Sequence, residues 1–362
     1  MIKKQRDALY RLRTLCCSGF NTVSIAPDIF HHIHKILPNE ACALFLTDPT
    51  GMPYMFYHED SPENARALFQ NEPQLFMGRH EYNIFKIATA PIKSGYFLHP
   101  DEEYFSSHTY QHLVRASGHH HTLEVRLEVL SKAAGALLLF REPSSKPFQS
   151  ADLPNINQIA RYIEYSLNTD SIEQAFLSPI ETEQALIIVN PETHEIQFST
   201  LAAELMLKEI PLIHNLWQTG KPLPIICTQL IQQLCHGSQL PETTIKIPSG
   251  HLYVRAEWLN AQQSTHRLIV LHLKKFMPRS LMLWQFLQKT DLNAQQASVA
   301  FLLLTGLSKN MIQTQLSISE AVVKDCIKSI YQYFSVHSLD ELIKFLYYQA
   351  NLGIYSSHQI QS

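Results

Sequence analysis

The stretch LTGLSKNMIQTQLSISEAVVKDCIKSIYQYFSVHS, residues 304–338, decides how this chain folds near its carboxyl end. Helix-forming segments between residues 292 and 350 are interrupted where Gly can end a helix and Ser can cap the next one. The interruptions fall at Gly306 with Ser308, Ser317 with Ser319, and Val336 with Ser338. We therefore expect four short helices, the second and third joined by about three residues around Ser317. Such a connection is typical of a helix-turn-helix, whose later helix enters the DNA major groove.

The third of these helices has an apolar face and a polar face. The apolar residues recur at helical spacing and predict a buried stripe of Val323, Ile327, Ile330 and Phe334. The outer face then presents Lys324, Asp325, Lys328 and Gln332. Lysine side chains donate to guanine edges and to phosphates, so this face is suited to DNA.

The residues of this region also carry a family resemblance. Leu292, Val299, Gly306, Leu307, Ser308, Ile312, Leu316, Ile318, Ser319, Val323, Lys324, Ile330, Val336 and Ser338 stand in an order and spacing that resemble the LuxR/NarL-type helix-turn-helix. The resemblance implies a transcriptional regulator that binds double-stranded DNA as a homodimer. By position it implies base-reading roles for Lys324, Asp325 and Lys328, and backbone contacts for Lys309, Ser319 and Val322.

The final helix is expected to supply the dimer contact. It presents Leu342, Ile343, Leu346 and Tyr347, more apolar surface than a module of this size can cover alone. Packing of the same residues on the upstream domains is the open alternative.

Five positions depart from the family pattern. The usual acidic residue, threonine, histidine, lysine and arginine are replaced by Gln296, Val322, Cys326, Tyr333 and Leu339. Two of these changes remove groups that contact phosphate, and affinity grows with the number of phosphates neutralised. We therefore expect weak binding by a monomer. The alternative is an interaction or dimerisation protein with a degenerate helix-turn-helix that does not bind DNA.

Residues 1–176 read as an α+β domain. Helices are predicted at 3–17 and 27–37, a hairpin at 41–59, strands at 121–130 and 133–142, and a closing helix at 151–168 capped by Ser150 or Asp152. In 121–130, Leu123, Val125 and Leu127 alternate with Glu124, Arg126 and Glu128, which predicts one buried and one wet face. The order of elements resembles a GAF domain.

Residues 177–275 read as a second α+β domain, and 283–352 as the all-α four-helix module. The second domain has two predicted strands, then helices, then three strands, an order that resembles a PAS domain. A chain of 362 residues also favours two or three domains. The net charge of −3 hides a cationic last quarter, because residues 274–362 carry eight Lys or Arg and five Asp or Glu.

Several other classes find no support in the sequence. GxSxG, Walker A and GxGxxG motifs are absent, so we expect no enzyme and no cofactor. His31 and His34 could share a metal at this spacing, but a solvated surface is favoured and no metal site is predicted. No apolar run is long enough for a membrane span, and scattered cysteines favour reduced thiols in a cytoplasmic protein.

A small-molecule effector is the remaining expected partner, and its binding residues are unknown. The aromatic side chains between residues 74 and 118 could close over such a molecule or form a satellite core: Phe76, Tyr82, Phe85, Tyr96, Phe97, Tyr104 and Phe105.

Overall fold

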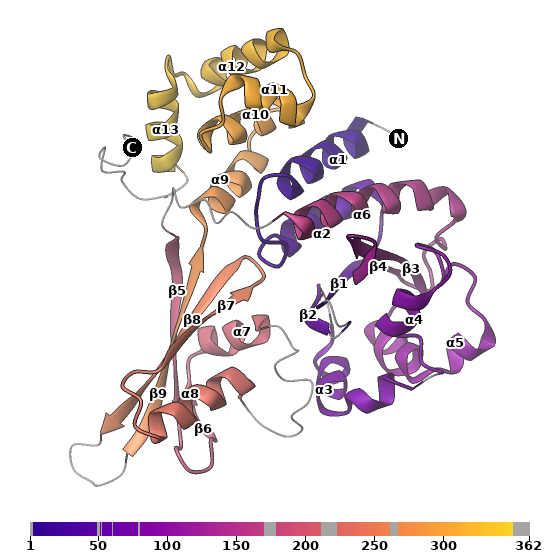
Figure 1. Ribbon diagram of the computed structural model, residues 1–362, viewed down its shortest axis with the longest axis vertical. Helices are drawn as coiled ribbons and strands as arrows, with labels where there is room; N and C mark the ends of the chain where they lie inside the picture. Colours follow the sequence, from indigo (N-terminus) through magenta and orange to yellow (C-terminus); the bar gives the residue numbers. More distant parts are fainter. Residues whose placement is uncertain are drawn as a thin grey trace.

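The protein is a mixed α/β chain with two antiparallel sheets and a carboxyl-terminal group of helices (Figure 1). The structure is a computed structural model that describes residues 3–48, 51, 53–59, 61–78, 80–169, 179–210, 223–260 and 267–349. The two sheets and the helical group follow one another along the chain. Both α+β readings of the sequence are therefore borne out at the level of sheets and helices.

The first sheet has the order β2-β1-β4-β3. Its strands are β1 (Ala41–Thr47), β2 (Pro53–His58), β3 (His121–Val129) and β4 (Lys132–Arg141). One face packs against α1 (Lys3–Cys16), α2 (Ala26–Ile36) and α6 (Leu153–Asn168). A 3-10 turn, Ser150–Asp152, precedes α6, and the Asp152 carboxylate accepts a hydrogen bond from the Gln149 N–H at 3.0 Å. The expected cap is therefore wrong: Gln149 is the capping residue one turn earlier, Asp152 is its capping-box partner, and neither Ser150 nor Asp152 caps the start of α6 through its side chain.

Residues 62–118 cover the opposite face of this sheet. They form α3 (Glu63–Asn71), α4 (Ile84–Thr89) and α5 (Glu102–Ser106), with short 3-10 turns at Pro73–Phe76 and Arg115–Ser117 and a π-helical turn at Thr109–Val114. This layer corrects the expectation of a wet face on β3, because Glu124 is only 1% exposed. The backbone N–H groups of Tyr96 and Phe97 donate to its carboxylate. Burial nevertheless raises the pKa of Glu124 to about 7.

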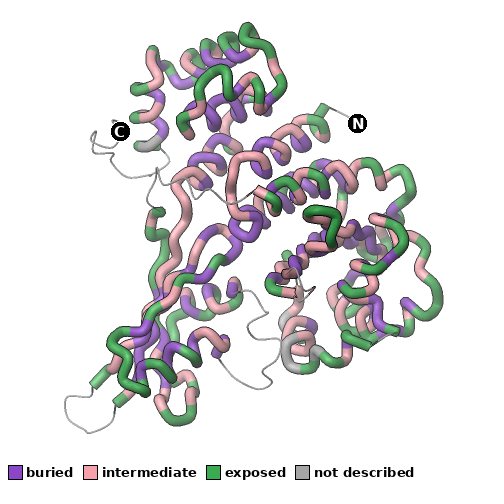
Figure 2. Tube along the Cα trace, in the orientation of Figure 1, coloured by how far each residue is buried: buried purple, intermediate pink, exposed green. Residues whose placement is uncertain are grey.

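The second sheet has the order β6-β5-β9-β8-β7. Its strands are β5 (Ile180–Val189), β6 (Ile196–Ser199), β7 (Glu242–Ile247), β8 (Gly250–Asn260) and β9 (Arg267–Met277). α7 (Leu201–Glu209) and α8 (Ile225–Cys235) pack against one face of this sheet, on the inward-alternating residues of its strands. Buried positions alternate along much of β8, whereas the first half of β5 and most of β6 are exposed (Figure 2).

Within the described residues, the carboxyl-terminal group contains five helices. They are α9 (Arg279–Gln288), α10 (Ala294–Leu304), α11 (Lys309–Leu316), α12 (Glu320–Phe334) and α13 (Leu339–Gln349). The last four were expected from the sequence, whereas α9 was not. The buried stripe predicted on α12 is confirmed, because Val323, Ile327, Ile330 and Phe334 are all less than a tenth exposed.

One hydrophobic core joins the helices of the first sheet to the carboxyl-terminal helices. α1 lies beside α10, and both helices appear together near the top of Figure 1. The rings of Phe20 and Phe301 lie 5.7 Å apart across this contact. The second sheet meets the first part at Ser24, whose carbonyl accepts from the Ser249 N–H at 2.9 Å.

The backbones of β1 and β4 approach each other closely at Gly135, and this contact can be used to test the fold. Gly135 has φ +153°, and a Cβ built there would lie 2.1 Å from the carbonyl oxygen of Phe45 on β1. We expect Gly135→Ala to lower the free energy of unfolding by about 2–3 kcal/mol, because β1 and β4 would have to separate. Urea unfolding measures this change.

Gly78→Ala is the matched control, since its Cβ would meet the nearest atom, Glu81 Cγ, at an ordinary 3.6 Å. Equal stability of the Gly135→Ala and Gly78→Ala proteins would contradict the described register of β1 and β4.

Candidate nucleic-acid interface and ligand cavity

The turn between α11 and α12 is short and held by its own backbone. Ser317 adopts the left-handed conformation with φ 55° and ψ 48°, and it ends α11. The Ile318 N–H donates to the Gln313 carbonyl at 3.1 Å. Ser319 then caps α12, because its hydroxyl accepts from the Val322 N–H at 3.4 Å. The predicted three-residue connection around Ser317 is therefore present.

The outer face of α12 is open to solvent. Among the residues with a predicted DNA role, Val322 is half-buried and the others are exposed: Lys309, Ser319, Lys324, Asp325 and Lys328. A hollow lies beside these lysines, lined by Lys309, Lys324, Ile327, Lys328, Tyr331, Gln332, Ser335, Val336 and His337. The fold thus brings lysines of α11 and α12 to one cationic surface.

The charge on this surface is partly balanced within α12. Lys324 Nζ lies 2.7 Å from Glu320 Oε1, and this hydrogen bond lowers the pKa of Glu320. Both side chains are 61% exposed, and ion pairs this exposed contribute little to stability. A phosphate or base edge can therefore replace Glu320 as the partner of Lys324 at small cost.

Three departures from the family pattern have structural roles here. Gln296 and Asn293 form a reciprocal capping box at the start of α10, with bonds of 2.9 and 3.1 Å. The Tyr333 hydroxyl accepts from the Asp291 N–H at 3.2 Å. Cys326 is buried in the shared core. These three residues therefore contribute to the stability of the helical module.

α13 is buried on its inner side. Leu342 and Leu346 have no exposed surface and belong to the core of the helical group. Ile343 and Phe345 are half-buried, and the rings of Phe334 and Phe345 lie 5.6 Å apart. The side chain of Tyr347 is outside the described residues. Leu342 and Leu346 are therefore buried within a single copy of the chain, and Ile343 is the one predicted dimer residue among the described side chains that keeps exposed surface.

α1 reaches the helix-turn-helix through polar contacts that the sequence did not reveal. Arg13 Nη2 donates to the Gln315 carbonyl at 3.2 Å and to Ser317 Oγ at 3.4 Å. Gln315 Nε2 donates back to the Cys17 carbonyl at 3.0 Å. Thr14 and Ser298 share a buried hydroxyl bond of 2.9 Å. Hydrogen bonds with α1 and Cys17 thus hold the turn between α11 and α12, while the outer face of α12 remains exposed to solvent.

A second contact joins α2 to α9. Gln285 Nε2 donates to Asp28 Oδ2 at 3.0 Å, and the rings of His32 and Trp284 meet edge to face at 6.2 Å. His32 is 1% exposed, and neither ring nitrogen has a hydrogen-bond partner among the described residues. Burial, followed by the nearby His31, Lys35 and Arg11, holds the pKa of His32 well below its ordinary value. The imidazole of His32 is therefore neutral in this contact, because protonation would place an unpaired charge in the core.

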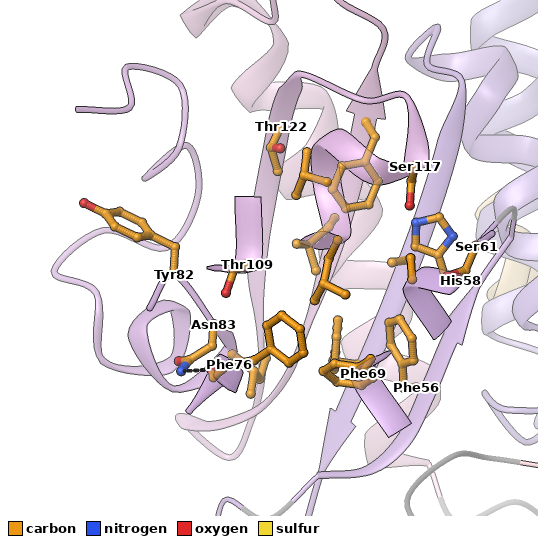
Figure 3. Close-up of a pocket in the computed structure, with 18 of the residues that line it drawn as sticks. Phe56, His58, Ser61, Phe69, Phe76, Tyr82, Asn83, Thr109, Ser117 and Thr122 are labelled. Carbon is orange, nitrogen blue, oxygen red and sulfur yellow. Dashed lines mark hydrogen bonds between the residues drawn. The ribbon is translucent and has the colours of Figure 1, made fainter. Parts of the chain in front are cut away.

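The cavity of the first domain lies between its sheet and the layer formed by residues 62–118. Its volume is about 140 Å³, close to the roughly 150 Å³ that holds a benzene in other proteins. Figure 3 shows Phe56, Phe69 and Phe76 grouped at one end of the pocket. The predicted aromatic stretch contributes Phe76, Tyr82, Phe85, Phe97 and Tyr104 to the lining, and Tyr96 and Phe105 to the cluster around it.

Most polar side chains at this cavity already have protein partners. Thr109 Oγ1 donates to Glu81 at 2.7 Å, Tyr104 and Thr122 share a bond of 3.1 Å, and Asn83 Nδ2 donates to the Phe76 carbonyl at 2.8 Å. Because these groups are satisfied, the cavity favours a neutral and mainly apolar occupant.

Comparison with known proteins gives weak similarities. No protein-family profile and no curated protein matches the chain. Among solved structures, Vibrio cholerae VqmA bound to ligand and DNA is 15% identical, with a TM-score of 0.28 over 48% of this chain and 85% of VqmA. A DNA-free VqmA dimer, described as a LuxR-type receptor, is 14% identical, with a TM-score of 0.20 over 47% and 84%. SdiA in complex with octanoyl-rac-glycerol is 12% identical, with a TM-score of 0.33 over 98% and 100%.

These neighbours are regulators, but similarities this weak carry no argument about the function of this chain.

In the described residues, no helix is long and apolar enough to cross a membrane.

The buried His32 predicts a pH effect. In the unfolded chain this imidazole takes up a proton near pH 6.5, whereas in the fold it stays neutral to much lower pH. Stability is therefore lost as the pH falls below about 6.5, by up to about 1.4 kcal/mol per unit from this residue. His32→Phe keeps an aromatic ring against Trp284 and should flatten urea-unfolding stability between pH 7 and pH 5.

The solvent-exposed His80 supplies the control, His80→Gln. Parallel pH profiles for the wild-type and His32→Phe proteins would show that His32 is not held neutral.

Proposed function

We propose that this protein is a ligand-responsive transcriptional regulator that binds DNA through α11 and α12. The observation that best supports this proposal is the three-residue turn between α11 and α12. It is followed by a capped helix whose outer face is exposed to solvent and carries lysines. This geometry suits an α-helix lying in the major groove. Lys324, Asp325 and Lys328 are the candidates for base edges, and Lys309, Ser319 and Val322 for the phosphate backbone.

The small number of cations implies weak binding by one copy. Dimerisation on DNA would double the phosphate contacts, and the surface of α13 around Ile343 is the proposed contact. We place this regulator in the cytoplasm, where double-stranded DNA is the partner.

Removing two lysines tests the DNA assignment. Each phosphate that is no longer neutralised should lower the slope of log affinity against log salt by about 0.9. Lys324 and Lys328 are assigned to base edges, but a lysine in the groove also neutralises the phosphates beside it. Lys324→Ala combined with Lys328→Ala should therefore weaken binding at low salt, relax the preference between DNA sequences and reduce the slope by about 2 for each bound copy. Gel shifts with genomic fragments over a salt titration measure these quantities.

Lys289→Ala is the matched control, because Lys289 is an exposed lysine at the end of α9, outside the helix-turn-helix. An unchanged slope in the double variant would remove these lysines from the interface. Absence of binding by the wild-type protein would favour the alternative, an interaction protein with a degenerate helix-turn-helix.

The two sheets are proposed as sensor modules. The first, with its covering helices and cavity, is assigned as GAF-like, and the second as PAS-like from its order of two strands, helices and three strands. The effector is proposed to occupy the cavity of the first module as a small, neutral, mainly apolar molecule.

The contact of α1 with the turn supplies a route for control. Arg13 binds Ser317 and Gln315 at the turn, while the other side of α1 belongs to the core of the sensor. An effector that binds one arrangement of α1 better than another shifts the orientation or spacing of two α12 helices.

Occupation of the cavity can be tested with indole, a neutral aromatic molecule with one N–H donor. We expect saturating indole to raise the melting temperature of the wild-type protein, because a ligand that binds only the folded state stabilises it. Ala43 is 1% exposed and lines the cavity. Ala43→Leu should fill part of the space and abolish the shift.

Ala88→Leu, on α4 but outside the cavity lining, should keep the full shift. A shift that survives in Ala43→Leu would place indole elsewhere, and no shift in the wild-type protein would exclude this cavity as a site for small aromatic molecules.

A further inference from the structure

Three chemically different metal donors meet at the edge of the first sheet. His34 lies near the end of α2, Cys42 in β1, and Glu59 directly after β2. Their donor atoms all lie within 4.8 Å of one another. In the part of the chain that the structure describes, no other three His, Cys, Asp or Glu side chains gather in this way.

Each of these side chains is held in place by a further contact. His34 Nδ1 lies 3.1 Å from the Asn39 carbonyl oxygen. The Cys42 N–H donates to Glu59 Oε2 at 3.1 Å, and the Glu59 N–H donates to the Cys42 carbonyl at 3.1 Å. Metal-binding histidines characteristically donate one ring N–H to a carbonyl, which orients the other nitrogen toward the ion. The imidazole and the carboxylate are therefore pre-positioned.

Positive charge between the two side chains favours the pairing of His34 with Glu59. When Nδ1 donates to the Asn39 carbonyl, the neutral ring directs the lone pair of Nε2 toward Glu59 Oε2 and Oε1, at 2.8 and 3.0 Å. At these distances a proton on Nε2 satisfies the pairing as a hydrogen bond, and a divalent ion can take the place of that proton once the nitrogen and the oxygen move apart to make room for it. The Cys42 thiol adjoins the same space, and its Sγ lies 3.3 Å from Asn39 Oδ1.

We propose that His34 Nε2, Cys42 Sγ and a Glu59 carboxylate oxygen form a binding site for a divalent transition-metal ion of the Zn²⁺ type. Mixed nitrogen, sulfur and oxygen donors suit this borderline-soft ion, which takes four ligands in tetrahedral geometry. Asn39 Oδ1 or a water supplies the fourth. On binding, the thiol forms its bond to the metal and releases its proton to solvent.

Two of the three proposed ligands are accessible to solvent, and metal binding would link α2 to the first sheet. Cys42 itself has no exposed surface, but the His34 and Glu59 side chains are each 29% exposed. The site is therefore open to solvent at His34 and Glu59, and the Cys42 thiol is its buried donor. Binding would tie the end of α2 to β1 and β2, and α2 also carries Asp28 and His32 to the contact with α9. The site stands independently of DNA binding.

The test uses the full-length protein in a Cys235→Ser background, which removes an exposed thiol that could bind metal unspecifically. After treatment with a chelator, Zn²⁺ is titrated against a chromophoric competitor, and Co²⁺ is added as a spectroscopic probe. We expect one saturable site and a sulfur-to-cobalt charge-transfer band. His34→Gln and Glu59→Gln should each weaken Zn²⁺ binding by about 10- to 100-fold or more, and Cys42→Ser should abolish the charge-transfer band.

His80→Gln is the matched control, since His80 and Glu103 form a comparable pair at 2.9 Å in the same domain without a thiol. It should bind Zn²⁺ as the wild-type protein does. If Cys42→Ser fails to fold, the partly exposed Glu59→Gln decides the question. The absence of a saturable site, wild-type affinity in both His34→Gln and Glu59→Gln, or a cobalt spectrum without the thiolate band would overturn the proposal.

Discussion

Burial of α1 on two sides is the constraint on which the arrangement of this protein depends. One side of the helix packs with α2 and α6 over the first sheet, and the other packs with α10. Leu12 and Leu15 have no exposed surface in the shared core. Arg11 and Arg13 extend from the same helix to the Leu292 carbonyl and to the turn at Ser317. Since the core is continuous, α1 cannot move relative to the sheet without disturbing its contact with the helix-turn-helix.

The contact between the helices of the first sheet and the carboxyl-terminal helices buries polar groups as well as apolar ones. Apolar burial supplies the attraction, but His32, Trp284 Nε1 and Gln288 Nε2 are buried without hydrogen-bond partners among the described residues. Each such group costs about 1–3 kcal/mol relative to solvation. The contact is therefore less stable than an apolar core of equal area would be. The exposed, lysine-bearing face of α12 lies outside this contact, so the contact can hold α12 in position while its lysines stay exposed.

The first sheet uses its two faces for different purposes. Leu44 and Leu46 point into the core shared with α1, α2 and α6, whereas Ala41 and Ala43 face the layer of residues 62–118. Small side chains on this second face leave the space that the aromatic rings enclose. At the edge of the same sheet, His34, Cys42 and Glu59 are joined by backbone pairing of β1 with residue 59. A single sheet thus supports a structural core, a cavity and a cluster of metal donors.

Local interactions were readable from the sequence, since they join residues a few positions apart. The serine caps at Ser308 and Ser319, the stripe on α12 and the strands of both sheets follow from helical or alternating periodicity and short turns. Features that depend on contacts between distant segments were decided by tertiary structure alone. Glu124 alternates as a solvent-facing residue, yet residues 94–97 cover it. Leu342 was expected at a dimer surface, yet it is buried in the core of a single copy of the chain. The helix α9 was missed although Leu281, Trp284 and Leu287 recur at helical spacing. The contact of Arg13 with the turn and the meeting of His34 with Cys42 and Glu59 leave no periodic signal, because only the packing of separate elements brings those groups together.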